Sequence, residues 1–423
     1  MRNRLTFALL VAMVIAIGQP ASLLATDGYF MHGYGTAQKG MGGAGVALLF
    51  GPTDAATNPA SGVFSGPGLD FGIAAFSPDR QFEVTGTPSG FPGTFGLKPG
   101  TVVSDSKWFP VPHVSATWML GPSAAFGIAM YGNGGMNTTY NQPVFGGTSP
   151  TGVNLSQMFI APNFSFRVAK GHSIGASVIL GYQMFEAKGL QAFSMYSSAP
   201  AKVTNNGSAS SLGGGVRVGY LGQLSPMFSV GASYQSRVKM GKFDDYAGLF
   251  AEQGGFDIPS NWTVGVGIKP AKGMDIAVDV QRVNYSEVAA IGHPMLPNLQ
   301  TAPLGSDNGA GFGWGDMTTL KLGVQFHAAA KTVLRAGYSY GQQPVPESEV
   351  MFNILAPGVI EQHVTAGLTQ AVGKKGAFNV AVTRALSNSV TGPNPLEAPN
   401  QQRITLTMDQ WDLEFGYTLR FGK

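Results

Sequence analysis

Hydrophobic and polar residues alternate along much of this chain, in segments of about ten residues. Between residues 173 and 185, every second position is apolar, as at Val178 and Leu180, and the positions between them are mostly Ser, Gly and Gln. Residues 412–421 repeat the pattern with charged residues on the polar face. A period of two predicts β-strands that have one apolar and one polar face.

Fourteen such segments are predicted, and an antiparallel barrel closes with an even number of strands. They begin near Leu69, His113, Ser123, Ser156, His172, Gly207, Met227, Ser260, Gly273, Phe312, Lys331, Ile360, Gly376 and Ile404.

The connections between the segments alternate in length, and this alternation indicates a membrane barrel. The short ones are rich in turn-forming residues and are predicted at 120–123, 169–171, 222–226, 270–273, 328–331 and 373–376. The long ones lack a strand or helix period and are predicted at 78–111, 133–155, 187–206, 240–259, 287–311, 342–359 and 389–403. Outer-membrane barrels have short periplasmic turns and long external loops. We therefore expect an all-β, 14-stranded antiparallel transmembrane β-barrel in the outer membrane of a Gram-negative cell.

Composition agrees with this class of protein. Only 12% of the 423 residues are charged, there are 60 glycines and there is no cysteine. After the N-terminus no run of about eighteen apolar residues occurs, so helical membrane spans are not expected. The net charge of +3 is too small to indicate nucleic-acid binding.

The first 25 residues have the features of a secretory signal peptide. Arg2 and Arg4 precede an apolar run from Leu5 to Ile17, and cleavage is predicted before Thr26. The alternative is a signal anchor, which a short run interrupted by Pro20 does not favour.

The segment between the cleavage site and the first strand resembles the N-terminal hatch of the FadL family of outer-membrane hydrophobic-compound transporters. The resemblance rests on the Gly40-to-Gly45 motif GMGGAG, the Asp54-Ala55-Ala56 step and the triplet Asn58-Pro59-Ala60. It implies a hatch over residues 26–67, inside the lumen of a barrel formed by residues 68–423. Gly40, Gly42 and Gly43 are expected to let the hatch turn sharply.

The glycine motif also matches G-x-G-x-x-G, but no strand precedes it, so a nucleotide site is not predicted. No catalytic motif occurs, and the six His residues are scattered along the chain. We expect no enzymatic activity, no metal and no cofactor. A Ser–His pair on the outer rim would instead indicate an outer-membrane hydrolase.

Two long loops carry apolar residues that form either a ligand groove or simple loop packing over the barrel mouth. Residues 244–253 have helical spacing and predict a short surface helix. The candidate groove residues are Leu190, Phe193, Met195, Tyr246, Leu249, Phe250 and Phe256.

The family resemblance further implies that a solute leaves sideways, through a gap made by an inward kink of the third strand beside the Asn-Pro-Ala triplet. In this chain that strand is Ser123–Asn133, and Gly127, Gly132 and Gly134 are the candidates that permit the bend.

Basic residues on the predicted inner face have two interpretations. Arg167, Arg217, Lys321 and Arg335 either bind a substrate carboxylate or form a network with inner-face acids that braces the barrel.

The resemblance implies uptake of hydrophobic small molecules, either long-chain fatty acids or aromatic or aliphatic hydrocarbons. The alternative function is a general porin or structural barrel without a specific ligand. Expected partners are outer-membrane lipid, lipopolysaccharide and, through the apolar C-terminal strand, the barrel-assembly machinery. A monomer is expected.

Overall fold

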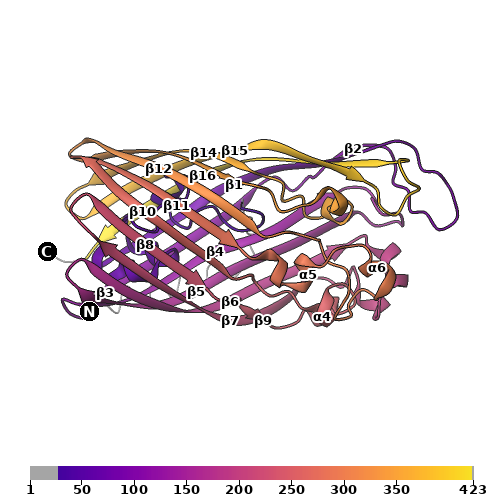
Figure 1. Cartoon of the computed structure of the whole chain (residues 1–423), viewed down its shortest axis with the longest axis horizontal. Coiled ribbons are helices and arrows are strands. Elements are labelled where there is room, and N and C mark those ends of the chain that lie inside the picture. Colours follow the sequence, from indigo (N-terminus) through magenta and orange to yellow (C-terminus); the bar gives the residue numbers. More distant parts are fainter. Residues whose placement is uncertain (1–26, 422–423) are drawn as a thin grey trace.

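The computed structural model describes residues 27–421, so the predicted signal peptide lies outside the described residues. Its strands form one antiparallel sheet that closes on itself (Figure 1). Closure is made by β1 (Gly68–Thr85) and β16 (Arg403–Arg420), which pair from Gly68↔Arg420 to Thr85↔Arg403. The predicted closed antiparallel barrel is therefore confirmed.

Two of the sixteen strands, β2 (Gly100–Val103) and β9 (Lys239–Met240), are short additions to β1 and β7, and the other fourteen form the barrel wall. The remaining wall strands are β3 (Phe109–Met119), β4 (Ala124–Tyr140), β5 (Thr151–Ala169), β6 (His172–Lys188), β7 (Ala209–Gln223), β8 (Phe228–Gln235), β10 (Asn261–Ala271), β11 (Met274–Val283), β12 (Met317–Ala329), β13 (Thr332–Gly341), β14 (Gln362–Val372) and β15 (Gly376–Pro393).

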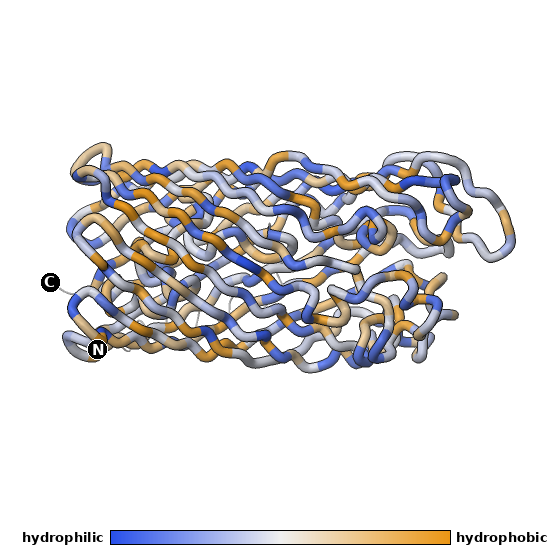
Figure 2. Tube along the Cα trace, in the orientation of Figure 1, coloured by the Kyte–Doolittle hydropathy of each residue, from blue (hydrophilic) through white to orange (hydrophobic). Residues whose placement is uncertain are grey.

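The wall has its apolar face outside, as the period of two predicts. On β6, Val178 and Leu180 are 53% and 51% exposed, whereas Ser177 and Gln183 are buried in the lumen. Apolar and polar residues alternate along the strands in Figure 2. Because a surface of exposed Val, Leu and Phe is stable only in an apolar solvent, this band faces lipid.

The two ends of the barrel differ (Figure 1). Tight turns connect the strands at one end, and the long loops at the other end carry short helices. In the part of the chain that the structure describes, no helix is long and apolar enough to cross a membrane. The loop helices are η3 (Gln191–Tyr196), η4 (Pro200–Lys202), η5 (Asp244–Tyr246), α4 (Ala251–Gly254), η6 (Tyr285–Glu287), α5 (Ala289–Gly292), α6 (Asn298–Thr301), η7 (Glu347–Glu349) and η8 (Phe352–Ile354).

Several strands extend further into the loop end than the sequence pattern predicts. The segments 78–85, 133–140 and 389–393 were expected in loops but continue β1, β4 and β15. Cross-strand hydroxyl pairs such as Ser389–Thr407 and backbone ladders support them beyond the apolar band. Beyond the apolar band the alternation is inverted, because Phe82 and Val84 point inward and are buried whereas polar residues such as Glu83 face outward.

The N-terminal segment fills the lumen at the turn end, where Figure 1 shows it in indigo inside the barrel. Among residues 27–65 only Leu49 is classed as exposed. This segment, which we call the hatch, contains α2 (Thr36–Lys39), η1 (Pro52–Ala56), η2 (Pro59–Ser61) and α3 (Gly62–Ser65).

Candidate functional site

A buried ion cluster ties the hatch to the wall. The Lys39 ammonium on α2 lies 2.7 Å from Asp412 and 2.6 Å from Glu414 on β16, and all three side chains are 2% exposed. Glu414 also accepts a hydrogen bond from the Thr36 hydroxyl at 2.7 Å and lies 3.3 Å from the His113 ring. Buried charges persist only when paired and hydrogen-bonded, so this cluster holds one orientation of the hatch.

Wall side chains also bind hatch backbone. Asp279 on β11 accepts hydrogen bonds from the N–H groups of Gly45 and Val46 at 2.7 and 2.9 Å. Lys321 on β12 donates to the His32 carbonyl at 2.8 Å and forms an ion pair with Asp27 at 2.9 Å. Within the hatch, burial raises the pKa of Asp54 to about 7. The interior network therefore braces the hatch.

The glycines of the GMGGAG motif allow the hatch backbone to touch the wall. A Cβ on Gly40 would lie 2.9 Å from the Cα of Gly367 on β14. Gly43 has a φ of +76°, and a Cβ there would overlap the His32 carbonyl. Gly42 donates its N–H to the Thr365 hydroxyl at 2.8 Å. All three positions exclude a larger side chain in this packing.

The Asn-Pro-Ala triplet caps and anchors η2. The Asn58 side chain accepts the Ala60 N–H at 3.1 Å and donates to the carbonyls of Val46 and Tyr220, each at 2.9 Å. The Ala60 carbonyl accepts from the Ser173 hydroxyl at 2.8 Å. The triplet thus packs on β6 and β7, and the expectation that it lies beside the third strand is wrong. The hatch residues Tyr29 and Met31, which precede the triplet, contact the third strand instead.

That third strand, β4, has a β-bulge at Asn133. Its register with β5 shifts between Gly132↔Met158 and Gly134↔Gln157. The bulge bonds to the start of the hatch, because the Met31 N–H donates to the Asn133 carbonyl and the Gly135 N–H donates to the Tyr29 carbonyl, each at 3.0 Å. Gly132 and Gly134 flank this bulge.

The third candidate glycine of this strand has a different setting. Gly127 lies in an uninterrupted ladder between Thr117 and Asn163. It therefore does not mark the bend in this structure.

Two outward-facing side chains of the wall near the bulge are covered. Val114 on β3 and Met130 on β4 face outward but are only 3% and 5% exposed. Outward residues of neighbouring strands, such as Ile73 and Ile174, are about half exposed, at 52% and 48%. Val114 and Met130 are therefore shielded from lipid, unlike the outward residues around them.

The strand pairing of the wall is also incomplete on the loop-end side of these two residues. The β1–β3 ladder ends at Phe76↔Phe109, and the β3–β4 ladder ends at His113↔Tyr131. Residues 77–80 of β1 and 133–138 of β4 consequently have no β3 residue paired between them, and the non-strand residues 104–106 bond to both sides: the Ser104 N–H donates to the Arg80 carbonyl and the Asp105 N–H donates to the Thr139 carbonyl, each at 2.8 Å. We call this gap in the strand pairing the wall break.

At the loop end, an apolar cavity of about 40 Å³ lies between the loops. Leu190 and Phe193 of one candidate loop and Leu249 and Phe250 of the other line it. Residues from two further loops complete the lining, among them Phe312 and Phe352. The structure therefore brings four of the seven candidate groove residues together.

The other three candidates lie elsewhere. Met195 is 80% exposed, and Phe256 is buried below the cavity against Phe250. The Tyr246 hydroxyl bonds to the Gly207 carbonyl and accepts the Ala187 N–H at 3.1 Å. The short helix predicted over residues 244–253 is wrong, because Phe250 is extended between η5 and α4, and Glu252 and Gln253 within α4 have non-helical φ values of +57° and +55°.

A continuous group of buried aromatic rings connects the cavity to the hatch. Phe250 contacts Phe256 with ring centroids 4.9 Å apart, and Phe256 lies 6.4 Å from Tyr29. Tyr29 lies 5.2 Å from Phe30, which forms a β-bridge with Gly134 at the bulge. Apolar side chains therefore extend from the loops to the wall break.

The basic lumen candidates have four different environments. Lys321 is in the bracing network described above, and Arg167 is exposed at the turn end with its guanidinium 5.1 Å from the Phe64 ring. Arg335 donates to Gln325 and Thr369 at 3.1 and 2.6 Å. Arg217 is 3% exposed, donates to Tyr131 at 2.9 Å and to Gln235, and has no ion pair with any described carboxylate.

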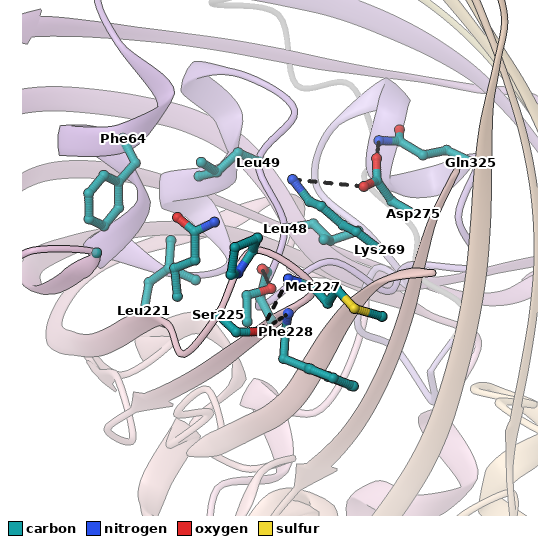
Figure 3. Close-up of a pocket in the computed structure, with 15 residues that line it drawn as sticks. Leu48, Leu49, Phe64, Leu221, Ser225, Met227, Phe228, Lys269, Asp275 and Gln325 are labelled. Carbon is teal, nitrogen blue, oxygen red and sulfur yellow. Dashed lines mark hydrogen bonds and ion pairs between the residues drawn. The ribbon is translucent and has the colours of Figure 1, made fainter. Parts of the chain in front are cut away.

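A second cavity, of about 260 Å³, lies at the turn end (Figure 3). Hatch residues Leu48, Leu49 and Phe64 form one side of it, and the β7–β8 turn with Met227 forms another. Lys269 and Asp275 lie across from them, 3.8 Å apart. This pocket adjoins the exposed Leu49, so solvent reaches it at the turn end.

Over residues 27–421 no group of three or more His, Asp or Glu side chains is placed to hold a metal ion.

The chain was then compared with known proteins. The model of the family described as outer membrane protein transport protein (OMPP1/FadL/TodX) matches residues 13–410. The chain belongs to this family. It is accordingly an outer-membrane transport protein and not an enzyme.

Solved structures of FadL-family proteins share the fold. The Pseudomonas putida toluene transporter TodX is 17% identical, with a TM-score of 0.68 over 93% of this chain and 99% of that one. A Pseudomonas aeruginosa FadL homologue is 15% identical, with a TM-score of 0.68 over 95% and 100%. The Ralstonia pickettii toluene transporter TbuX is 17% identical, with a TM-score of 0.59 over 92% and 99%. Comparison with curated proteins finds no sequence match.

Sequence reasoning missed several residues at the bulge and in the hatch. Tyr29, Met31 and Asn133 carry the hatch-to-wall pairing, and Lys39 anchors the ion cluster. One signal was present in the sequence: Asn133 stands among Gly132, Gly134 and Gly135, a run that strands rarely contain.

Proposed function

We propose that this protein takes up hydrophobic compounds, binding them between the outer loops and releasing them sideways through the wall break into the membrane. The observation that carries the proposal is the continuous aromatic path from the loop cavity to Phe30 at the bulge of β4. The family relationship supports a transport role, and two of the structurally similar proteins are toluene transporters.

The outer cavity suits an apolar solute. Nearly all of its lining is aliphatic or aromatic, which favours apolar molecules over ions or sugars. At about 40 Å³ it is smaller than the roughly 300–1,000 Å³ of ordinary ligand pockets. The loops must therefore separate when a solute binds.

The wall break provides the exit in this proposal. An apolar solute that leaves into lipid avoids water, and each CH₂ group kept out of water contributes about 0.8 kcal/mol. The hatch meets the wall at the bulge, where the Tyr29 carbonyl and the Met31 N–H bond to the backbone of β4. Release sideways is therefore favoured over release into an aqueous compartment.

A second candidate route runs along the barrel axis. The 260 Å³ pocket beside Leu48, Leu49 and Phe64 is larger than the outer cavity and lies at the turn end. A solute that passed the hatch would leave there. The general-porin alternative is less favoured, because the hatch fills the lumen with buried residues.

The loop cavity is tested by a matched pair of variants in one loop. Phe193 is buried and lies 5.2–5.7 Å from the rings of Phe95, Phe145 and Phe352, whereas Met195 is 80% exposed. We expect Phe193→Ala to weaken binding of toluene and oleate at least about tenfold, or about 1.4 kcal/mol. Met195→Ala should leave binding unchanged. Equal effects of the two variants would place the site elsewhere.

Arg217 distinguishes the two substrate classes. Its buried guanidinium has only neutral partners, and the ring of Tyr34 lies 5.6 Å away. If the solute is a fatty acid, Arg217→Met should lower oleate affinity about tenfold or more while leaving toluene affinity unchanged, since only the carboxylate forms a charge-assisted bond. Binding isotherms for both compounds measure this difference. If the affinities for oleate and toluene change equally and only slightly, Arg217 does not bind a substrate carboxylate and only braces the barrel.

A further inference from the structure

At the wall break, the edge of β4 that faces β1 has no paired strand. Its backbone groups form hydrogen bonds with other parts of the chain instead. Asn133 and Gly135 bond to the hatch. Thr139 donates its N–H to the Ser104 hydroxyl at 3.0 Å, and its carbonyl accepts the Asp105 N–H at 2.8 Å. Between these two sets lies the Asn137 carbonyl. Unpaired backbone groups are costly away from water, so each of these partners helps to keep the break closed.

The partner of the Asn137 carbonyl is Arg80. From β1, its guanidinium reaches across the break and donates to the carbonyls of Asn137 and Ser106. The side chain is 2% exposed, and its guanidinium carbon lies 5.6 Å from the centre of the Phe109 ring. Arg80 is therefore the one β1 side chain described that bonds directly to the unpaired edge of β4, beside the backbone link in which the Ser104 N–H donates to the Arg80 carbonyl at 2.8 Å.

The environment of Arg80 makes this connection reversible. No described carboxylate forms an ion pair with it, and its Nε has no hydrogen-bond partner. The neighbouring side chains Asp79 and Lys107 are 57% and 47% exposed, so hydrated charged groups lie at the same level along the barrel axis as Arg80. A buried guanidinium bound only to neutral carbonyls loses less on moving to water than one held by a carboxylate.

We propose that Arg80 is the latch of the lateral exit. With its guanidinium across the break, β1 and β4 stay joined and the hatch segment is closed off from lipid. When the guanidinium withdraws, the gap opens and the solute at Phe30 passes into the membrane. Arg80 is thus a positioning residue that sets the rate of release, and this inference rests on the proposed lateral function.

Two substitutions at Arg80 test the latch. Arg80→Met keeps a long apolar stem beside Phe109 but removes every donor, and Arg80→Lys keeps the charge with a single ammonium. We expect Arg80→Met to raise the rate of toluene and oleate uptake by cells about tenfold, with unchanged equilibrium binding of both compounds to the purified protein. Arg80→Lys should lie between Arg80→Met and the unmodified protein.

A crosslink tests the same gap in the opposite direction. The Ser106 hydroxyl, in the segment that follows β2 and is therefore attached to β1, lies 2.7 Å from the Thr139 hydroxyl on β4, and the chain has no cysteine. An oxidised Ser106→Cys/Thr139→Cys pair should lower uptake to about a tenth or less, and reduction should restore it. The control is Ser389→Cys/Thr407→Cys, whose hydroxyls are 2.8 Å apart on β15 and β16, on the opposite side of β1 from the wall break. Its oxidation should not change uptake.

The outcomes separate the two proposals. If the unmodified protein takes up neither compound, the proposed function is wrong whatever the variants do. If it does take them up, and the oxidised Ser106–Thr139 pair transports at the reduced rate, the latch is wrong and the function stands. The crosslink tests the latch independently, so the proposal can still be contradicted if Arg80→Met fails to fold.

Discussion

Replacing Lys39 with Met is expected to release the hatch from β16 while the barrel remains folded. The substitution leaves Asp412 and Glu414 buried without their ammonium, and removing one partner of a buried ion pair costs about 3–5 kcal/mol. This loss destabilises the attachment of the hatch and not the barrel itself, because the wall strands keep their backbone ladders. In planar bilayers the Lys39→Met protein should conduct ions at least about tenfold better than the unmodified protein, in keeping with a loss of this size.

The matched control removes all the charges together. Combining Lys39→Met with Asp412→Asn and Glu414→Gln leaves no unpaired buried charge and should return conductance most of the way to the original level. Heat-dependent migration in gels should show a folded barrel for every variant. If Lys39→Met stays closed to ions, the ion cluster does not hold the hatch.

The second large effect is expected at Gly175 on β6. A Cβ there would overlap the Pro59 carbonyl group and lie 2.5 Å from the Ala60 nitrogen, so it meets backbone that no side-chain rotation relieves. Gly175→Ala should therefore push η2 off the wall and disrupt the bonds of Asn58 to Val46 and Tyr220. Ion conductance should rise, and the hatch should become accessible to protease in the folded barrel.

Gly214 on the adjacent strand β7 supplies the control. A Cβ at Gly214 would have only one neighbour within 4 Å, the Ile179 carbonyl oxygen at 3.9 Å. Gly214→Ala should thus leave conductance and protease resistance unchanged. Similar behaviour of the two variants would mean that close packing of the Asn-Pro-Ala triplet does not seal the lumen.

The wall could be predicted from the sequence because its signal is local. Residues that face lipid alternate with residues that face the lumen. The residue types along one strand are therefore enough to assign Val178 to the lipid face and Gln183 to the lumen face, even when the neighbouring strands are not known. The alternation also located the six tight turns. Beyond the membrane boundary the apolar residues, such as Phe82 and Val390, lie on the inner face instead, which is why the outer parts of β1, β4 and β15 were missed.

The candidate site was predicted less completely, because its contacts join distant parts of the chain. Lys39 meets Asp412 across 373 positions, and Phe30 reaches Gly134 only after the barrel closes. The loop aromatics were visible in the sequence, but no local pattern showed that Phe312 and Phe352 complete their cavity. Arg80 follows a Pro-Asp step that looks like a turn, and its contacts with the carbonyls of Asn137 and Ser106 depend on the bend of β4.

The central claim, that a hydrophobic solute leaves through the wall, is tested most directly by photolabelling during uptake. Cells are given an alkane that carries a diazirine, irradiated while uptake proceeds, and the labelled residues are identified by mass spectrometry. The account predicts labels around Phe193 and Phe352, at Tyr29 and Phe30, and on residues 77–80 and 133–138 that border the wall break. Labels at Leu48, Leu49 and Phe64 in the turn-end pocket, with none at the wall break, would contradict it and would show that the solute leaves along the barrel axis.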